Sequence, residues 1–207
     1  MGKIIRLYGM GVLLGILGSP LPAACGAESD PVTLNFHEKN GHFDIQAGFG
    51  VEADRETVWE TLTDFEHYPK LSPELKKVRQ VSRSGNHWVY EQVAEGGFLF
   101  FTQKVFFLLD IHGEPGRYLI CEDVSHHSFT SHHVRWDIRR VSKGRYSLSY
   151  RLKAEAHFDA PAFLVNDHFK GGAEHFLREM RKEILRRQAS KAGPSPPVPK
   201  ASVEGNK

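Results

Sequence analysis

The sequence contains only two cysteines, Cys25 and Cys121, among its 207 residues. Cys25 falls within or beside a predicted export signal, so the mature domain is left with one thiol and no internal disulfide. A domain of this kind must take its stability from a packed hydrophobic core. The cysteine count therefore excludes a small disulfide-stapled scaffold.

The chain also lacks an excess of charge of either sign. It carries 27 Lys and Arg residues against 25 Asp and Glu residues. Lys3 and Arg6 lie in the predicted signal, so the mature chain holds 25 residues of each sign and is formally neutral. A nucleic-acid-binding protein needs clustered basic residues to neutralise phosphates. We therefore expect no nucleic-acid partner.

No N-terminal apolar run reaches the about 20 residues that cross a bilayer. An uncharged run over residues 7–17 follows two basic residues, and small residues follow at 23–27. This order is typical of an export signal, so we expect residues 1–27 to be removed and the protein to be periplasmic. The surroundings of Cys25 also resemble a lipobox. A membrane-anchored lipoprotein is therefore an alternative to a cysteine that is discarded with the signal.

The rest of the chain suits one domain followed by a tail. Residues 28–190 have the length expected for a single core. Residues 191–207 are rich in Pro, Ser, Gly and Lys and contain no aromatic residue. Such a segment cannot bury enough apolar surface to offset its ordering entropy. We therefore predict a disordered Pro-rich tail.

Alternating apolar residues predict antiparallel strands over most of the domain. Two alternating runs between residues 32 and 53 flank Asn40-Gly41, a dipeptide that favours a hairpin turn. Between residues 75 and 158, short runs rich in Val, Tyr, Phe, Trp and Thr are separated by turn residues. The run over 146–158 alternates most regularly and predicts one apolar and one polar face. Together these runs predict a sheet of six or seven strands.

Two segments show helical periodicity instead. Asp54 is expected to cap a first helix that buries Trp59 and Phe65. Pro161 can begin a second, long helix that runs to about Arg187 with one apolar stripe. Only this helix is long enough to cover the apolar face of the sheet. We therefore predict an α+β helix-grip fold, with a ligand cavity between the curved sheet and the C-terminal helix.

A resemblance to a known superfamily is carried by residues 51–69, VEADRETVWETLTDFEHYP. This segment resembles the opening of the polyketide cyclase/dehydrase and START-like superfamily, which includes the coenzyme Q-binding START and SRPBCC proteins. The order of elements is similar from about residue 43 to residue 187. The resemblance implies the helix-grip fold, whose members include lipid carriers, coenzyme Q-binding proteins, aromatic polyketide cyclases and ribosome-associated toxins.

The predicted cavity wall follows from strand parity and from the apolar stripe of the long helix. Each wall residue is a candidate ligand contact or plain core, because both are built from the same residue types. The candidates are Trp88, Tyr90, Val134, Trp136, Leu148, Tyr150, Leu152, Phe169, Phe176 and Met180.

Four histidines, His126, His127, His132 and His133, lie close together at a predicted strand connection. Imidazoles on a hairpin can hold zinc or copper. No Cys or carboxylate stands at convincing ligand spacing, and adjacent strand residues point to opposite faces. We therefore predict a solvated polar loop, with no metal and no cofactor.

The segments 98–101 and 105–109 place apolar residues, many of them Phe, on both faces of their strands. One set must then face out of the sheet. An exposed apolar patch favours contact with a membrane surface or a partner protein. The alternative is that a loop or a second copy covers the outward set.

Gly171 and Gly172 fall in the middle of the predicted long helix. Each Gly costs about 1 kcal/mol relative to Ala in a helix interior. Three interpretations are open: close passage of the sheet or a ligand, a hinge that opens the cavity, or a tolerated local weakness.

Export and the resemblance together favour carriage of a hydrophobic small molecule, such as a lipid, quinone or sterol-like compound, across a periplasm. One alternative is a cyclase-type enzyme acting on an aromatic or polyketide-like substrate through Tyr90, Gln92, His132 or Tyr150. No Ser-His-Asp order, phosphate loop or dinucleotide fingerprint is found, so no catalytic residue is assigned. The other alternative is an interaction module that docks through the Phe-rich strands.

Overall fold

The computed structural model describes residues 31–98, 101–156 and 162–192. The predicted signal, Cys25 and residues 193–207 of the predicted tail lie outside the described residues. The elements are, in order, β1 (Thr33–Lys39), β2 (His42–Glu52), α1 (Arg55–Thr63), η1 (Phe65–His67), α2 (Tyr68–Leu71), β3 (Leu75–Ser84), β4 (His87–Phe98), β5 (Phe101–Glu114), β6 (Tyr118–Asp123), β7 (Phe129–Ser142), β8 (Arg145–Ala156) and α3 (Ala162–Ala192). None of the helices in these ranges combines the length and hydropathy needed to cross a bilayer.

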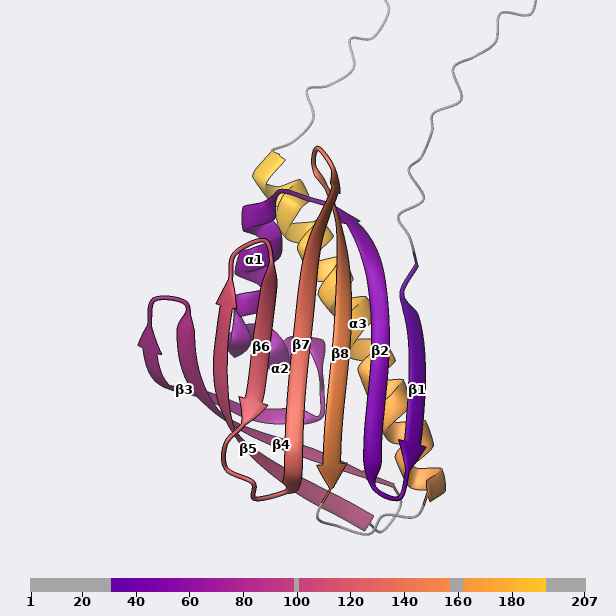
Figure 1. Cartoon of the computed structure of the whole chain (residues 1–207). Helices are drawn as coiled ribbons and strands as arrows, with labels where there is room; N and C mark the ends of the chain where they lie inside the picture. The colour runs from indigo at the N-terminus through magenta and orange to yellow at the C-terminus, as the bar shows by residue number, and fades with distance from the viewer. Residues whose placement is uncertain (1–30, 99–100, 157–161, 193–207) are drawn as a thin grey trace, which may run out of the picture.

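The strands form one antiparallel sheet in the order β1-β2-β8-β7-β6-β5-β4-β3. Figure 1 shows α3 running diagonally behind this sheet, so one face is covered by the helix and the other faces away from it. The predicted α+β helix-grip fold is confirmed. The described sheet has eight strands instead of the predicted six or seven. The chain between Leu75 and Ala156 divides into six strands, and the turn residues in the sequence did not mark every break between them.

The predicted hairpin at Asn40-Gly41 is confirmed by its backbone geometry. Lys39 and His42 pair directly, so the loop consists only of Asn40 and Gly41. Their φ angles are 53° and 76°, which is the left-handed region required by the tight turn of a twisted hairpin. The turn fixes the register of β1 on β2.

Asp54 precedes α1 as predicted, but its carboxylate does not cap that helix. The Asp54 carboxylate instead accepts a hydrogen bond of 3.1 Å from the Gln188 side-chain amide. The Asp54 backbone N–H donates to the Gln188 side-chain oxygen at 2.8 Å. This reciprocal pair ties the start of α1 to the C-terminal part of α3.

The long helix is confirmed, and it continues to Ala192, two residues into the predicted tail. A Cβ atom added at Gly171 or Gly172 would meet no atom within 4 Å. The interpretation that the sheet passes close to the helix backbone there is therefore wrong. Close passage of a ligand, the hinge and the tolerated weakness stay open.

Replacing Gly171 and Gly172 by Ala is expected to stabilise the protein by about 1 kcal/mol per site. The reason is that each Cβ enters open space in a helical backbone. Urea denaturation of the two single variants and the double variant measures the gain. If the double variant exchanges a bound ligand at the wild-type rate, the hinge is rejected.

Candidate functional site

The apolar side chains of the sheet face α3. On β8, Leu148 and Tyr150 are buried, whereas Arg151 and Lys153 on the opposite parity are exposed. The same alternation holds on the neighbouring strands. All ten predicted wall residues, seven on strands and three on α3, lie in the buried clusters or pack against them. They are Trp88, Tyr90, Val134, Trp136, Leu148, Tyr150, Leu152, Phe169, Phe176 and Met180. That these side chains contact a ligand stays a prediction.

Most of this interior is closely packed. Trp136 on β7 is 2% exposed, and its ring lies 4.8 Å from the Tyr150 ring and 6.1 Å from the Phe49 ring. Leu177 and Met180 of α3 are fully buried in the same cluster. We call this cluster the main core.

A second, smaller cluster of buried residues is separate from the main core. It consists of Phe43, Val105, Phe129 and Ala154, and we call it the distal cluster. Phe43 lies near the start of β2 and Ala154 near the end of β8, so this cluster lies at the lower end of the sheet in Figure 1. The Phe169 ring of α3 stacks on Phe43 at 5.0 Å, which brings the N-terminal part of the helix to this end.

Three apolar residues, Phe36, Phe107 and Leu152, contact both the main core and the distal cluster, and all three are only half-buried. Phe107 stacks on Phe129 with ring centroids 5.5 Å apart. The interior is thus apolar at this boundary but not fully buried. An apolar molecule placed there would remove exposed hydrophobic surface from water.

His132 lies at this boundary, so its assignment to a solvated polar loop is wrong. A register shift between Phe129 and Ser131 on β7 turns His132 toward the interior, opposite Ala154. The imidazole lies 4.7 Å from the Phe107 ring. Burial lowers the pKa of His132 to about 4, so the ring is neutral at pH 7.

Two other titratable side chains of the interior are also neutral. Burial raises the pKa of the Cys121 thiol to about 12. Burial likewise raises the pKa of the Tyr150 phenol, with a smaller contribution from Cys121. A thiol or phenol in such a setting is a weak nucleophile, because only the ionised form attacks efficiently. The interior side chains therefore suit an uncharged apolar guest.

The four residues considered as acid or base groups do not form a connected set. The Tyr90 hydroxyl donates to the Gln80 side-chain oxygen at 3.1 Å. Within the described ranges, no hydrogen bond joins any two of Tyr90, Gln92, His132 and Tyr150. The geometry thus supplies polar groups in an apolar interior without a nucleophile–base pair.

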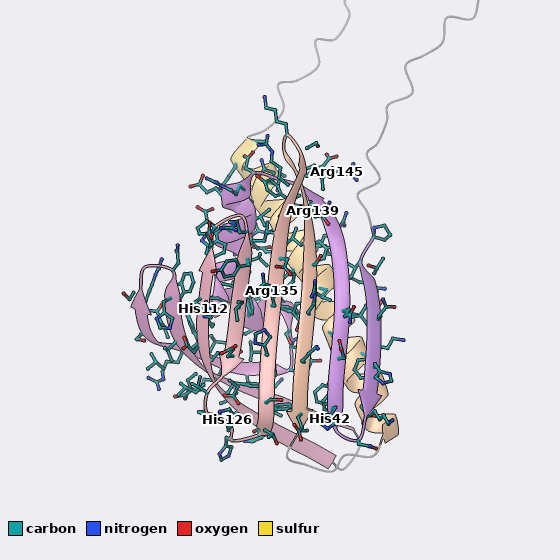
Figure 2. The ribbon with its side chains drawn as sticks, in the orientation of Figure 1. His42, His112, His126, Arg135, Arg139 and Arg145 are labelled. Atoms are coloured by element: carbon teal, nitrogen blue, oxygen red, sulfur yellow. The ribbon has the colours of Figure 1, made fainter. Side chains whose placement is uncertain are left out.

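The other three histidines of the cluster point elsewhere. The His126 ring makes a 3.0 Å hydrogen bond to the Thr130 carbonyl, and Figure 2 shows it at the lower end of the molecule. The His127 ring packs edge-on against Phe106, and His133 pairs with Glu122 on the outer face. In the described part of the chain, no group of three or more potential ligands could hold a metal ion.

The outward residues of the Phe-rich strand are partly covered by a loop. Phe106 and Leu108 are half-buried. Their backbone N–H groups donate to the Ser128 hydroxyl and the Asp123 carboxylate, at 3.1 and 3.0 Å. These bonds lie along the edge of β5, whereas the His127 ring of the loop between β6 and β7 packs against the outward Phe106 ring. Whether the rest of this face contacts a partner or a membrane surface stays open. Residues 99–100 lie outside the described residues.

Asp123 is the site residue that sequence reasoning missed. Its side chain is buried, although it ends a strand and begins a polar loop. Alternation with Leu119 and Cys121 could have placed it on the inner face. Nothing in the sequence showed that its carboxylate would stay inside.

Comparisons with known proteins agree with this geometry. The family described as polyketide cyclase / dehydrase and lipid transport matches residues 51–181. No curated protein matches the chain.

Solved structures with similar folds share little sequence with the chain. The Zhui aromatase/cyclase from a Streptomyces species is 12% identical with a TM-score of 0.57, and the match spans 73% of this chain and 96% of that one. A START superfamily protein from Mycobacterium smegmatis is 20% identical with a TM-score of 0.53, over 73% of this chain and 99% of that one. Human STARD10 is 13% identical with a TM-score of 0.57, over 77% and 76% of the two chains. These similarities show the START-like fold.

The family match covers more than half of the sequence and includes α1, the sheet from β3 to β8 and much of α3. The chain therefore belongs to the polyketide cyclase/dehydrase and lipid transport family.

Proposed function

We propose that this protein binds and carries a hydrophobic small molecule, of the lipid, quinone or sterol-like kind, between α3 and the sheet. The observation that carries the proposal is the boundary between the main core and the distal cluster. There Phe36, Phe107 and Leu152 lie in the interior and yet keep exposed surface. A guest at this boundary would join the two clusters into one apolar interior.

The energetics need no catalytic group. Covering apolar surface contributes about 25 cal/mol per Å², and a site already formed loses little of this to ordering. The neutral forms of His132, Cys121 and Tyr150 favour an uncharged guest over an ion. Binding is therefore the simplest function of this interior.

The comparisons support both carriage and its alternative. A human StarD13 structure with this fold is named a lipid transfer domain, whereas the Zhui structure is named an aromatase/cyclase. The lack of a hydrogen-bonded acid–base set favours carriage. The predicted export signal supports a periplasmic setting, where an apolar molecule needs a soluble container.

The direct test is native mass spectrometry of the full-length protein purified from its own host. A co-purifying apolar mass that is released by organic solvent supports carriage. Turnover of an aromatic polyketide-like substrate by protein that carries no ligand would support the cyclase alternative instead.

Phe107→Ala is expected to weaken binding of an uncharged probe, N-phenyl-1-naphthylamine, by about five- to tenfold, because it removes a ring from the proposed contact surface. Phe106→Ala is the matched control, since Phe106 is the next residue on β5 and lies on the opposite face. Fluorescence titration measures both. Equal losses in the two variants would contradict the proposed location.

A further inference from the structure

Three buried side-chain polar atoms have no hydrogen-bond partner within the described ranges: Oγ1 of Thr57 on α1, and two atoms that lie together on the sheet. Of these two, one is Oδ2 of Asp123 on β6, and the other is Nδ1 of His132 on β7. Asp123 is only 4% exposed. Leaving buried polar atoms unpaired is costly, so each orphan needs an explanation.

The two orphans on the sheet belong to neighbouring positions of adjacent strands. Glu122 pairs with His133 across β6 and β7, and Nδ1 of His133 lies 2.9 Å from Oε1 of Glu122. His133 shares the parity of Arg135, which Figure 2 shows on the face away from α3. Asp123 and His132, each one residue along its strand, therefore point to the inner face together. The charge of Asp123 acts on the His132 ring.

Asp123 is held in place by its other oxygen. Oδ1 accepts hydrogen bonds from the Leu108 N–H at 3.0 Å, the Ser125 N–H at 3.0 Å and the Ser125 hydroxyl at 2.7 Å. The carboxylate is thus fixed by loop and strand, and Oδ2 is left as a preorganised acceptor. His132 is fixed between Phe107 and Phe129, whose rings lie 4.7 and 5.5 Å away.

A hydroxyl group placed between the two atoms would satisfy both at once. An O–H can donate to a carboxylate oxygen, and its oxygen can accept from the N–H of a neutral imidazole protonated on Nδ1. Burial keeps His132 neutral at pH 7, which leaves it one ring N–H to donate. A hydrocarbon satisfies neither atom, and an anion would be repelled by Asp123.

We infer that the ligand of this protein is an apolar molecule that carries a hydroxyl group, which donates to Oδ2 of Asp123 and accepts from Nδ1 of His132. This inference rests on the proposed function and names the class of its ligand. The apolar part of the molecule lies against Phe107 and Leu152 at the boundary of the two clusters. A water molecule is the other source of the same chemistry, and the experiment separates the two.

The test compares three probes that share one ring system: naphthalene, 2-methoxynaphthalene and 2-naphthol. Calorimetric or fluorescence titration of the full-length protein at pH 7 gives the three affinities. 2-Naphthol is expected to bind at least about tenfold more tightly than the other two, because only it can donate to the carboxylate. If a water molecule fills the polar position, the hydroxyl brings no advantage and the inference fails.

Two variants locate the effect. Asp123→Asn keeps an acceptor at Oδ1 and replaces Oδ2 by an NH2 donor, so the preference for 2-naphthol over its methyl ether should disappear. His132→Phe keeps a ring between Phe107 and Phe129 and should reduce the preference to about threefold or less. Circular dichroism and thermal melting confirm that both variants fold. A full preference retained in both variants overturns the assignment to these atoms.

The outcomes distinguish the two proposals. Equal wild-type binding of all three probes overturns the hydroxyl inference and leaves apolar binding intact. Failure of all three probes to bind, together with no apolar mass in native mass spectrometry, overturns the proposed function itself.

Discussion

Trp136→Ala is expected to reduce the free energy of unfolding by about 3–5 kcal/mol. Trp136 lies on the central strand β7, is 2% exposed and contacts the Phe49 and Tyr150 rings, so truncation leaves a cavity that the sheet cannot close. Urea denaturation followed by circular dichroism measures the loss. Since a single domain has about 5–15 kcal/mol to lose, the variant is expected to melt well below the wild type.

Comparing the stability losses of Trp136→Ala and Phe107→Ala tests whether the main core is more closely packed than its boundary with the distal cluster. Phe107 is half-buried at the boundary, so its truncation should cost less than half as much stability. Trp136→Phe, which keeps a ring in the main core, should fall between the two. If Phe107→Ala and Trp136→Ala cost the same, the boundary is as closely packed as the main core, and the proposed binding surface is wrong.

Much of this fold follows from local sequence signals. Asn40-Gly41 adopts the left-handed backbone that its composition favours, and alternation along 146–158 assigns the inner and outer faces of β8 correctly over its described part. The segment over residues 51–69 marks the family, and the matched region begins at residue 51. These signals depend on residues that are neighbours in sequence, so they can be identified without a structure.

The features that define the site depend on contacts distant in sequence. His132 turns inward because of a register shift near Phe129, and no composition rule locates such a shift. The orphan atom of Asp123 depends on which of its oxygens the loop uses. The half-burial of Phe107 depends on its contacts with Phe129 and His132 on β7, which are distant in sequence. The alternation of apolar residues along the strands predicts which residues face the interior. It does not predict which of them lie in the main core and which lie at the boundary with the distal cluster.

An ion-pair network centred on the buried Glu183 joins α3 to the end of α1, at the opposite end of α3 from the distal cluster. Arg187 donates to Oε1 of Glu183 at 2.7 Å and to Oδ2 of Asp64, after α1, at 2.5 Å. Arg186 also binds Glu183, with contacts of 2.7 and 2.6 Å. The Glu183 side chain is 8% exposed, so its charge depends on these partners.

Arg187→Met is expected to cost about 3 kcal/mol of unfolding free energy at pH 7, because it leaves Asp64 without this partner and Glu183 with one Arg fewer in a buried position. Arg186→Met is the matched control. The Arg186 side chain binds only Glu183 of the two acids, so its removal tests the Glu183 contacts alone and should cost less than Arg187→Met. Equal losses would show that the Asp64 contact adds nothing.

Lowering the pH should reduce the stability difference between the wild type and Arg187→Met, and the direction follows from the pKa of Glu183. Hydrogen bonds from Arg186, followed by those from Arg187, lower the pKa of Glu183 to about 2, against an ordinary value of 4.5. A carboxylate with a lowered pKa stabilises the folded state fully above pH 4.5, and that contribution, about 3 kcal/mol, is lost as the pH falls toward 2. Protonated Glu183 no longer needs a cation beside it. The stability gap between wild type and Arg187→Met should therefore narrow from pH 4.5 to pH 2 in urea titrations at each pH, and a constant gap would mean that Arg187 acts through packing alone.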